Sequence, residues 1–144
     1  GAMAVGGRVM VSSLPGHLPV SQDSRLMELF VQNAKTMVGN NGIVTRGQWT
    51  GSTDMGDLSQ IMPCIHPYVS AAQGIPHGSD YLVTDYELGV LTSGKIIAMT
   101  IVDLLTNGGR TAISIVNRFR ASMTKTEYLA YLRGAFFEDV FVEK

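Results

Sequence analysis

The sequence predicts an α/β fold, and the pattern of its elements predicts only about half of such a domain. Two long stretches, near residues 26–37 and 85–105, carry apolar side chains at helical spacing. Strand-like patterns are short and few, the clearest at residues 7–13 and 43–46 and an irregular one at 64–72. A doubly wound sheet normally contains four or more strand–helix units, and this sequence offers two or three. We therefore expect a mixed chain whose sheet is incomplete.

The composition is typical of one domain that hides part of its surface against something else. The chain has 144 residues, and 45% of them are hydrophobic, which is enough for a core. Charged residues make up 16%, below the roughly 25% of an average soluble domain. A monomer with a large core fits these figures equally well. No apolar run reaches the roughly 18 residues of a membrane span, so we expect no membrane association.

Net charge and cysteine content bear on the binding partners and the cellular compartment of the protein. The net charge is -1, without the basic stripe that nucleic-acid binding requires, so we expect no nucleic-acid partner. The single cysteine, Cys64, has no internal disulfide partner, which favours a reducing compartment and a cytoplasmic protein. Residues 1–3 resemble a cloning scar. One basic cluster is diluted by apolar residues; it consists of Arg110, Arg118, Arg120 and Lys125.

The first helix has recognisable boundaries. Ser21 or Asp23 is suited to cap its N-terminus, because short polar side chains accept hydrogen bonds from the free amides of a first turn. Gly39 is expected to end it. Residues 54–62 then predict a short helix that ends before a proline, and residues 64–72 predict an irregular edge strand.

The most strongly predicted helix spans about residues 85–105. Thr84 and Glu87 have the spacing of a capping box, in which a hydroxyl and a carboxylate each satisfy a free amide. Gly89 and Gly94 lower helix stability by about 1 kcal/mol each relative to alanine. We therefore expect this helix to approach a sheet closely at both glycines.

The C-terminal part is less uniform. Gly108 is expected to end the long helix, and residues 113–119 fit either a helix or a strand. Thr124 and Glu127 repeat the capping-box spacing at the start of a last helix.

The candidate functional residues lie in the polar, turn-rich segment from Gly51 to Tyr81, and loops of this kind commonly carry function. His77 precedes Gly78, where the backbone can approach a ligand closely. A neutral imidazole is a common metal ligand, although a complete site needs three or four convergent ligands. Taken alone, His77 is more simply explained as a solvated loop histidine.

Two further features of this segment allow a functional and a structural interpretation. A tetrad of small and polar residues precedes the short helix, where free amides attract anions, but plain helix capping is the favoured explanation. His66, held by the proline after it, contacts either a substrate or nearby backbone. Cys64 is expected to be a packing residue, since no cation lowers the pKa of its thiol. The tetrad consists of Gly51, Ser52, Thr53 and Asp54.

Three remaining polar residues carry no functional prediction. His17 lies in a proline- and glycine-rich connector, and Asp57 and Asp80 are expected to be solvated.

Three motifs follow one another in a recognisable order: PGHLPV at residues 15–20, GSTDMGDLSQIMPCIHPY at 51–68 and HGSDYLVTDYELG at 77–89. Together they resemble the C-terminal part of the catalytic domain in the metal-dependent amidohydrolase/peptidase family. That family includes carboxypeptidase G, aminoacylase and aminobenzoyl-glutamate hydrolase, and the β-alanyl-dipeptidase-like branch is the most similar. Order and spacing agree over residues 7–140.

The resemblance implies a three-layer, zinc-peptidase-like α/β catalytic domain of which this chain is the C-terminal half. In that family an inserted lid domain, which mediates dimers, splits the catalytic domain in sequence. Residues 4–14 would then be the tail of the lid or a linker, and residues 15–144 the second catalytic segment. A homo-oligomer is expected on the same ground.

The resemblance also implies hydrolysis of an amide bond in an N-acyl amino acid or a dipeptide-like small molecule. One or two divalent ions, zinc first with manganese or cobalt as alternatives, polarise the carbonyl and lower the pKa of a bound water. His77 would be a metal ligand, and Gly51–Asp54 with His66 would line the substrate side. The other ligands and the general base come from the first half, so the chain alone is expected to be inactive. The alternative is a non-catalytic folding or interaction module derived from this family.

Overall fold

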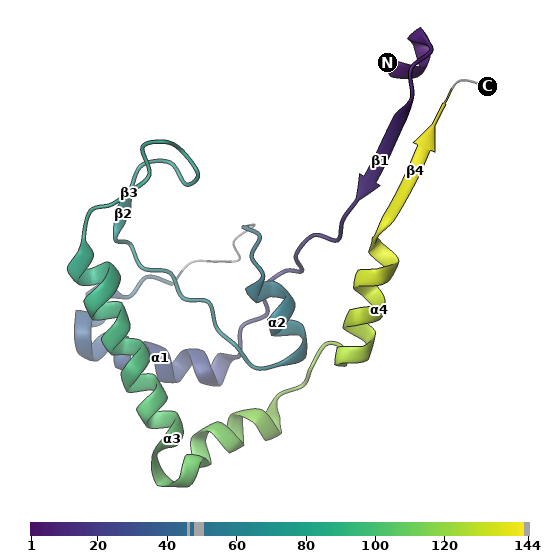
Figure 1. Cartoon of the computed structure of the whole chain (residues 1–144). Coiled ribbons are helices and arrows are strands. Elements are labelled where there is room, and N and C mark those ends of the chain that lie inside the picture. The colour runs from purple at the N-terminus through teal and green to yellow at the C-terminus, as the bar shows by residue number, and fades with distance from the viewer. Residues whose placement is uncertain (46, 48–50, 143–144) are drawn as a thin grey trace.

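The computed structural model describes residues 1–45, 47 and 51–142, which combine helices with short strands, 53% of the chain being helical (Figure 1). This confirms the predicted mixed class with few strands. The α-helices are α1 (Ser24–Val38), α2 (Met55–Ile61), α3 (Ser93–Arg118) and α4 (Lys125–Ala135), and the strands are β1 (Val9–Ser13), β2 (Ala72–Gln73), β3 (Leu82–Val83) and β4 (Phe137–Phe141). Short helical segments are η1 (Ala2–Val5), η2 (Asn40–Gly42) and the π-helix η3 (Glu87–Thr92).

The strands form two separate antiparallel pairs. β1 pairs with β4 over five residues, from Val9 opposite Phe141 to Ser13 opposite Phe137. β2 pairs with β3 over two residues. Within the described ranges neither pair gains a third strand. An isolated two-stranded pair is marginal in water, so these strands do not by themselves form a sheet on which the helices can pack.

Two predicted strands are not formed as expected. Residues 43–45 have no regular structure, and Arg46, the last residue of that prediction, lies outside the described residues. In the stretch 64–72 only Ala72 is in a strand. Pro67 supplies no backbone N–H, and no strand of the described residues pairs with residues 43–45 or 64–71. Local β propensity alone therefore does not form a strand here.

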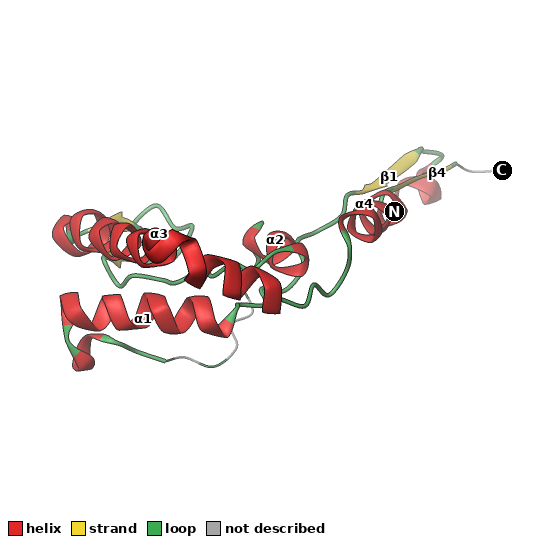
Figure 2. Ribbon diagram, turned by 90° about the horizontal axis from the view of Figure 1, so that it is seen from below, coloured by secondary structure: helices red, strands yellow, loops and turns green. Residues whose placement is uncertain are grey.

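The buried centre lies where α1 packs against α3, as two adjacent layers in Figure 2. Ala34 of α1 and Ile96 and Ile115 of α3 are buried there. The Asn33 amide crosses the interface and donates hydrogen bonds to Thr100 Oγ1 (3.3 Å) and Asp103 Oδ2 (2.8 Å). The pair therefore combines a small apolar contact with a polar clamp.

The helix ends follow the predicted caps at α1 and α4. The Asp23 carboxylate accepts hydrogen bonds from the amides of Arg25 and Leu26, both at 3.0 Å, so Asp23 rather than Ser21 is the cap. Gly39, with φ 72°, ends α1. Both hydrogen bonds of the capping box at Thr124 and Glu127 are present at α4.

The long helix differs from its prediction at both ends. The capping box at Thr84 is not formed; instead Asp85 Oδ1 accepts a hydrogen bond from the Leu88 amide at 2.8 Å. The helix begins with η3 and continues as α3 beyond the predicted end to Arg118. Residues 106–109 are non-helical inside it, with Gly108 at φ 69°. Gly108 therefore breaks the helix as predicted, but a second helical part follows the break, and it contains most of residues 113–119.

The two glycines of this helix have different surroundings. A Cβ at Gly89 would lie 2.8 Å from the Cβ of Ala71, beside β2. The predicted close approach is confirmed there. A Cβ at Gly94 would meet nothing within 4 Å. No described residue explains Gly94.

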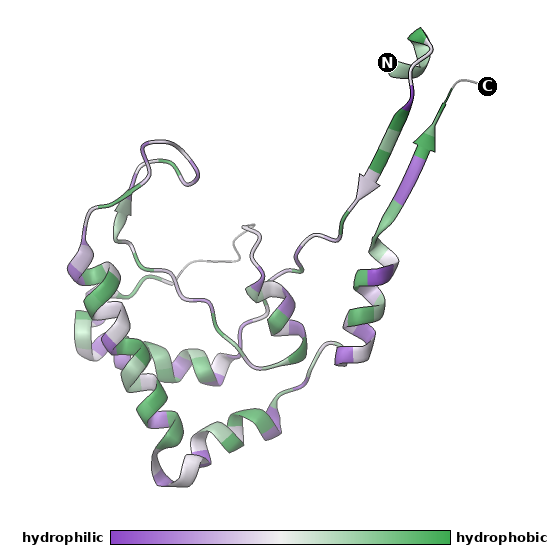
Figure 3. Cartoon of the chain, viewed as in Figure 1, coloured by the Kyte–Doolittle hydropathy of each residue, from purple (hydrophilic) through white to green (hydrophobic). Residues whose placement is uncertain are grey.

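The chain exposes far more surface than a compact protein of its mass. Its accessible surface is 10,673 Å² for 15.5 kDa. A folded monomer of that mass has about 7,200 Å², so the excess is roughly 3,500 Å². Figure 3 shows apolar residues along α3 and along the β1–β4 pair, which projects away from the helices. These include Ile97, Ile101, Val102 and Leu105, each about half exposed or more.

By length and composition, the helical stretch Glu87–Arg118 could cross a membrane, with 11% of its most apolar window buried. The core helix of a soluble protein passes the same test. The expectation of no membrane association stays a prediction.

Candidate functional site

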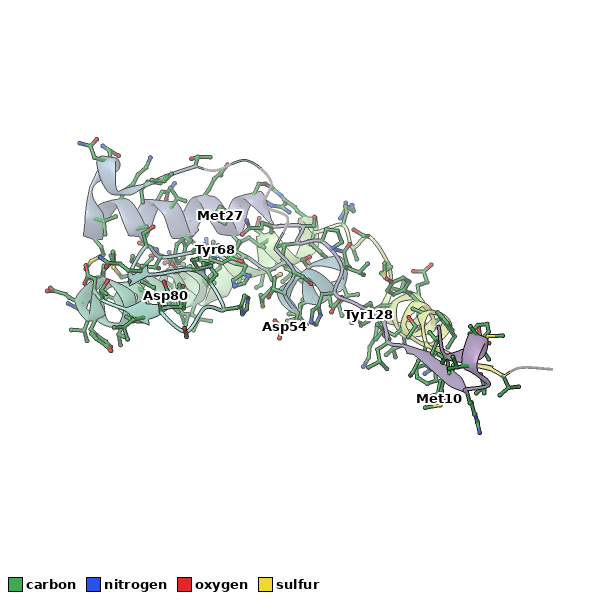
Figure 4. The ribbon with its side chains drawn as sticks, turned by 90° about the horizontal axis from the view of Figure 1, so that it is seen from above. Met10, Met27, Asp54, Tyr68, Asp80 and Tyr128 are labelled. Atoms are coloured by element: carbon green, nitrogen blue, oxygen red, sulfur yellow. The ribbon has the colours of Figure 1, made fainter. Side chains whose placement is uncertain are left out.

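The Gly51–Asp54 tetrad leads directly into α2. Thr53 Oγ1 accepts a hydrogen bond from the Met55 amide at 3.4 Å, which is long for a cap, and donates one to Asp54 Oδ1 at 3.1 Å. Asp54 makes no capping hydrogen bond itself. Gly51, Ser52 and Asp54 are exposed, and Figure 4 shows Asp54 at the surface. The favoured capping interpretation thus holds only weakly, through Thr53.

The connector before α1 is held firmly onto α2, which the sequence did not reveal. His17 Nδ1 lies 2.8 Å from Asp57 Oδ2, and the Leu18 amide donates to Asp57 Oδ1 at 3.0 Å. The buried Ser59 hydroxyl accepts a hydrogen bond from the Ser21 amide at 2.9 Å. Gly56 contacts the Leu18 carbonyl so closely that a Cβ would not fit. Asp57 is therefore a structural partner of the connector, and the prediction that it is solvated was wrong.

Burial raises the pKa of Asp57, but hydrogen bonds from His17 and the Leu18 amide, together with the charge of His17, outweigh it. The net result is a pKa below the ordinary value of 3.8. The Tyr128 hydroxyl of α4 contributes in the same direction. The carboxylate thus joins the connector, α2 and α4 in its ionised form.

The Cys64–Tyr68 stretch runs along the start of α1. The Asp23 amide donates to the Cys64 carbonyl at 3.0 Å, and the His66 amide donates to the side-chain oxygen of Gln22 at 2.8 Å. Burial raises the pKa of the Cys64 thiol above its ordinary value of 9.0, which agrees with a packing residue. These contacts hold the backbone of His66, in addition to the proline that follows it.

The imidazole of His66 is not fully hydrogen-bonded. Its Nδ1 is buried and has no hydrogen-bond partner among the described residues. Its ring lies against Tyr68, with centroids 4.8 Å apart. Buried polar atoms in folded proteins are nearly always hydrogen-bonded, so an atom of this kind calls for a partner from outside, such as a ligand or a water. The alternative, an imidazole hydrogen-bonded to nearby backbone, is not observed at Nδ1 within the described part of the chain; the hydrogen bond of His66 is made by its main-chain amide, to the side chain of Gln22.

His77 lies in the turn that joins β2 and β3. Its φ is 66°, which is unusual for a residue other than glycine. The Gly78 amide donates to the Ile75 carbonyl at 2.7 Å, and Asp80 Oδ1 accepts a 3.5 Å contact from the Ile75 amide. Asp80 therefore helps to shape the turn. The imidazole of His77 is exposed.

The described residues do not assemble a metal site around His77. No group of three or more His, Cys, Asp or Glu side chains within them could hold a metal ion. No hydrogen bond or ion pair of the described residues joins His77 to His66 or to the tetrad. His77 can supply one ligand, and the described part of the chain does not complete the ligand set of a metal centre.

Comparison of the chain with protein-family models, with curated protein sequences and with solved structures finds no match. The family relationship expected from the three motifs stays a prediction.

Proposed function

We propose that this chain is the C-terminal segment of the catalytic domain of a metal-dependent amidohydrolase/peptidase, inactive by itself. The order and spacing of the PGHLPV, GSTD…IHPY and HGSDY motifs over residues 7–140 carry this proposal. In it the chain forms one wall of a three-layer, zinc-peptidase-like domain. The substrate is an N-acyl amino acid or a dipeptide-like amide, and the whole protein is a cytoplasmic homo-oligomer.

The excess surface supports a missing wall. A typical protein interface takes about 800 Å² from each partner, and the excess of roughly 3,500 Å² is several times larger. The apolar face of α3 is the kind of surface that a central sheet covers in α/β domains. An incomplete domain accounts for both observations.

Two histidines support the placement of the site. A non-glycine residue at positive φ costs on the order of 1–3 kcal/mol, and such residues gather at functional sites. His77 is in this conformation, in an exposed turn. His66 brings a buried ring nitrogen without a partner among the described residues. We assign His77 one metal bond, and His66 with the Gly51–Asp54 tetrad the substrate side.

In this proposal the remaining metal ligands and the general base come from the preceding segment of the longer protein. A His-x-Asp or Cys-x-His motif followed by Glu-Glu upstream of residue 4 is therefore expected in its coding sequence. Zinc is the metal we expect first, with manganese or cobalt as alternatives. No chemical step is derived through the metal, because the ligand set described for this chain is incomplete.

The test uses the longer protein that contains this segment. Metal per chain is measured by mass spectrometry, and hydrolysis is measured with a panel of N-acetyl amino acids and β-alanyl dipeptides. His77→Ala should lose metal and at least about a hundredfold in rate, since one ligand of three or four is removed. The matched control His17→Ala should keep its metal.

Two results would count against the proposal. One is full metal content and rate in His77→Ala; the other is metal-dependent turnover by the 144 residues alone. The exposed surface equally suits a non-catalytic module that binds a partner. A longer protein that binds no metal, hydrolyses none of the panel and still associates through this segment would establish that module instead.

A further inference from the structure

A hollow of about 460 Å³ lies between the N-terminal part of α1 and the second part of α3, which run beside each other in Figures 1 and 2. It is shallow and largely open to solvent, so a ligand bound there would rely on charged and polar contacts more than on enclosure. It is at the opposite end of α3 from the β2–β3 turn that carries His77 (Figure 1). The hollow is therefore separate from the turn that carries His77, and neither histidine of the candidate site lines it.

The charge of this hollow is unlike that of the chain. Arg25, Arg110 and Arg118 line it, with Glu28 as the opposing carboxylate. Counting Asp23, which pairs with Arg25, the local charge is +1 in a chain whose net charge is -1. Of the three arginines, Arg25 is paired, its Nη2 lying 3.1 Å from Asp23 Oδ2. Among the described residues, Arg110 and Arg118 have no acidic partner within ion-pair distance.

The other lining groups suit an anion that has an organic part. Thr111 and Ser114 bring hydroxyl groups between the two unpaired arginines along the same helix. Guanidinium groups bind carboxylates and phosphates through paired hydrogen bonds, and hydroxyls add single donors. Leu29 and the buried Ile115 supply an apolar floor. A simple inorganic ion would leave that floor unused.

We propose that this hollow, defined by Arg25, Arg110 and Arg118, binds a small organic anion carrying at least two negative charges. Arg110 and Arg118 hold its charged groups, Ser114 donates a hydrogen bond between them, and the apolar floor contacts its carbon skeleton. The negative groups are phosphates or carboxylates, which share this recognition chemistry.

Isothermal titration of the chain at fixed ionic strength tests the proposal. Glycerol 3-phosphate and 1,3-bisphosphoglycerol analogues form the phosphate arm, and citrate forms the carboxylate arm. Arg110→Gln and Arg118→Gln should each weaken binding of the preferred probe at least about tenfold, as expected for a hydrogen-bonded charged group. Arg133→Gln on α4 removes the same charge outside the hollow and should change affinity less than twofold.

A charge-neutral variant separates the hollow from general electrostatics. Ser114→Leu fills the hollow and should weaken binding although the net charge is unchanged. Circular dichroism of each variant checks that the fold is retained; Arg110 and Arg118 are exposed, so their loss leaves the packing intact. Equal weakening in Arg118→Gln and Arg133→Gln, unchanged binding in Ser114→Leu, or no binding in either arm would each overturn the proposal.

Discussion

Gly89 and Gly94 allow a matched test of how the long helix packs. A Cβ at Gly89 would lie 2.8 Å from the Cβ of Ala71, which is buried. Alanine has no rotamer with which to move away, so the backbone must shift, and overpacking of this kind costs about 1–3 kcal/mol. At Gly94 an added Cβ meets nothing within 4 Å. Gly89 lies in the π-helix η3 and Gly94 in the first turn of α3, so each substitution is expected to gain helix propensity of up to about 1 kcal/mol.

Gly94→Ala is therefore expected to raise the free energy of unfolding by about 1 kcal/mol. Gly89→Ala is expected to leave it unchanged or lower it by up to about 2 kcal/mol, after the propensity gain is subtracted from the overpacking cost. The difference between the two variants isolates the clash with Ala71. Urea unfolding followed by circular dichroism measures both, with comparison of the m-values to check that the unfolded states are alike.

Equal stabilisation by both substitutions would refute the close approach of this helix to β2. The same pair also tests the missing wall. If a sheet covers α3 in the longer protein, the advantage of Gly94→Ala should disappear there, because the added methyl group would meet the covering surface. An advantage retained in the longer protein would mean that this face of α3 stays uncovered.

Three further outcomes are expected. Asn33→Ala should lower the free energy of unfolding by about 2–3 kcal/mol, and a double-mutant cycle with Asp103→Ala should show coupling above about 0.5 kcal/mol; additive effects would contradict the interhelical hydrogen bond. The pKa of Asp57 is lowered from 3.8, so its contribution to the free energy of unfolding should be fully present above pH 3.8 and be lost as the pH falls through the folded-state pKa. Urea unfolding at several pH values measures this, and Asp57→Asn should flatten that part of the pH profile. An unaltered profile would argue against the pair with His17. Thr124→Ala should cost about 1 kcal/mol in thermal unfolding, and an unchanged midpoint would argue against the capping box.

For the candidate site, the residues expected from the sequence can be compared with their surroundings in the structure. The sequence singled out His66 and His77 from residue type and neighbours alone. The structure adds that His66 has a buried nitrogen without a partner among the described residues and that His77 has a positive φ. It also shows what residue type did not reveal: His17 and Asp57, both set aside, form the ion pair that holds the connector to α2. Their separation of 40 residues gives no periodic signal in the sequence.

The sequence by itself determined the helices α1, α2 and α4, because helix periodicity, Asp23, Gly39 and the box at Thr124 act within a few residues of one another. It also determined the low strand content. Only the tertiary structure decided that β1 pairs with β4, that residues 43–45 stay irregular and that Gly89, but not Gly94, meets a neighbour. Strand pairing and close approach depend on which segments, distant in the sequence, pack against each other. The free energy of that packing comes from many long-range contacts, which the local sequence pattern does not encode.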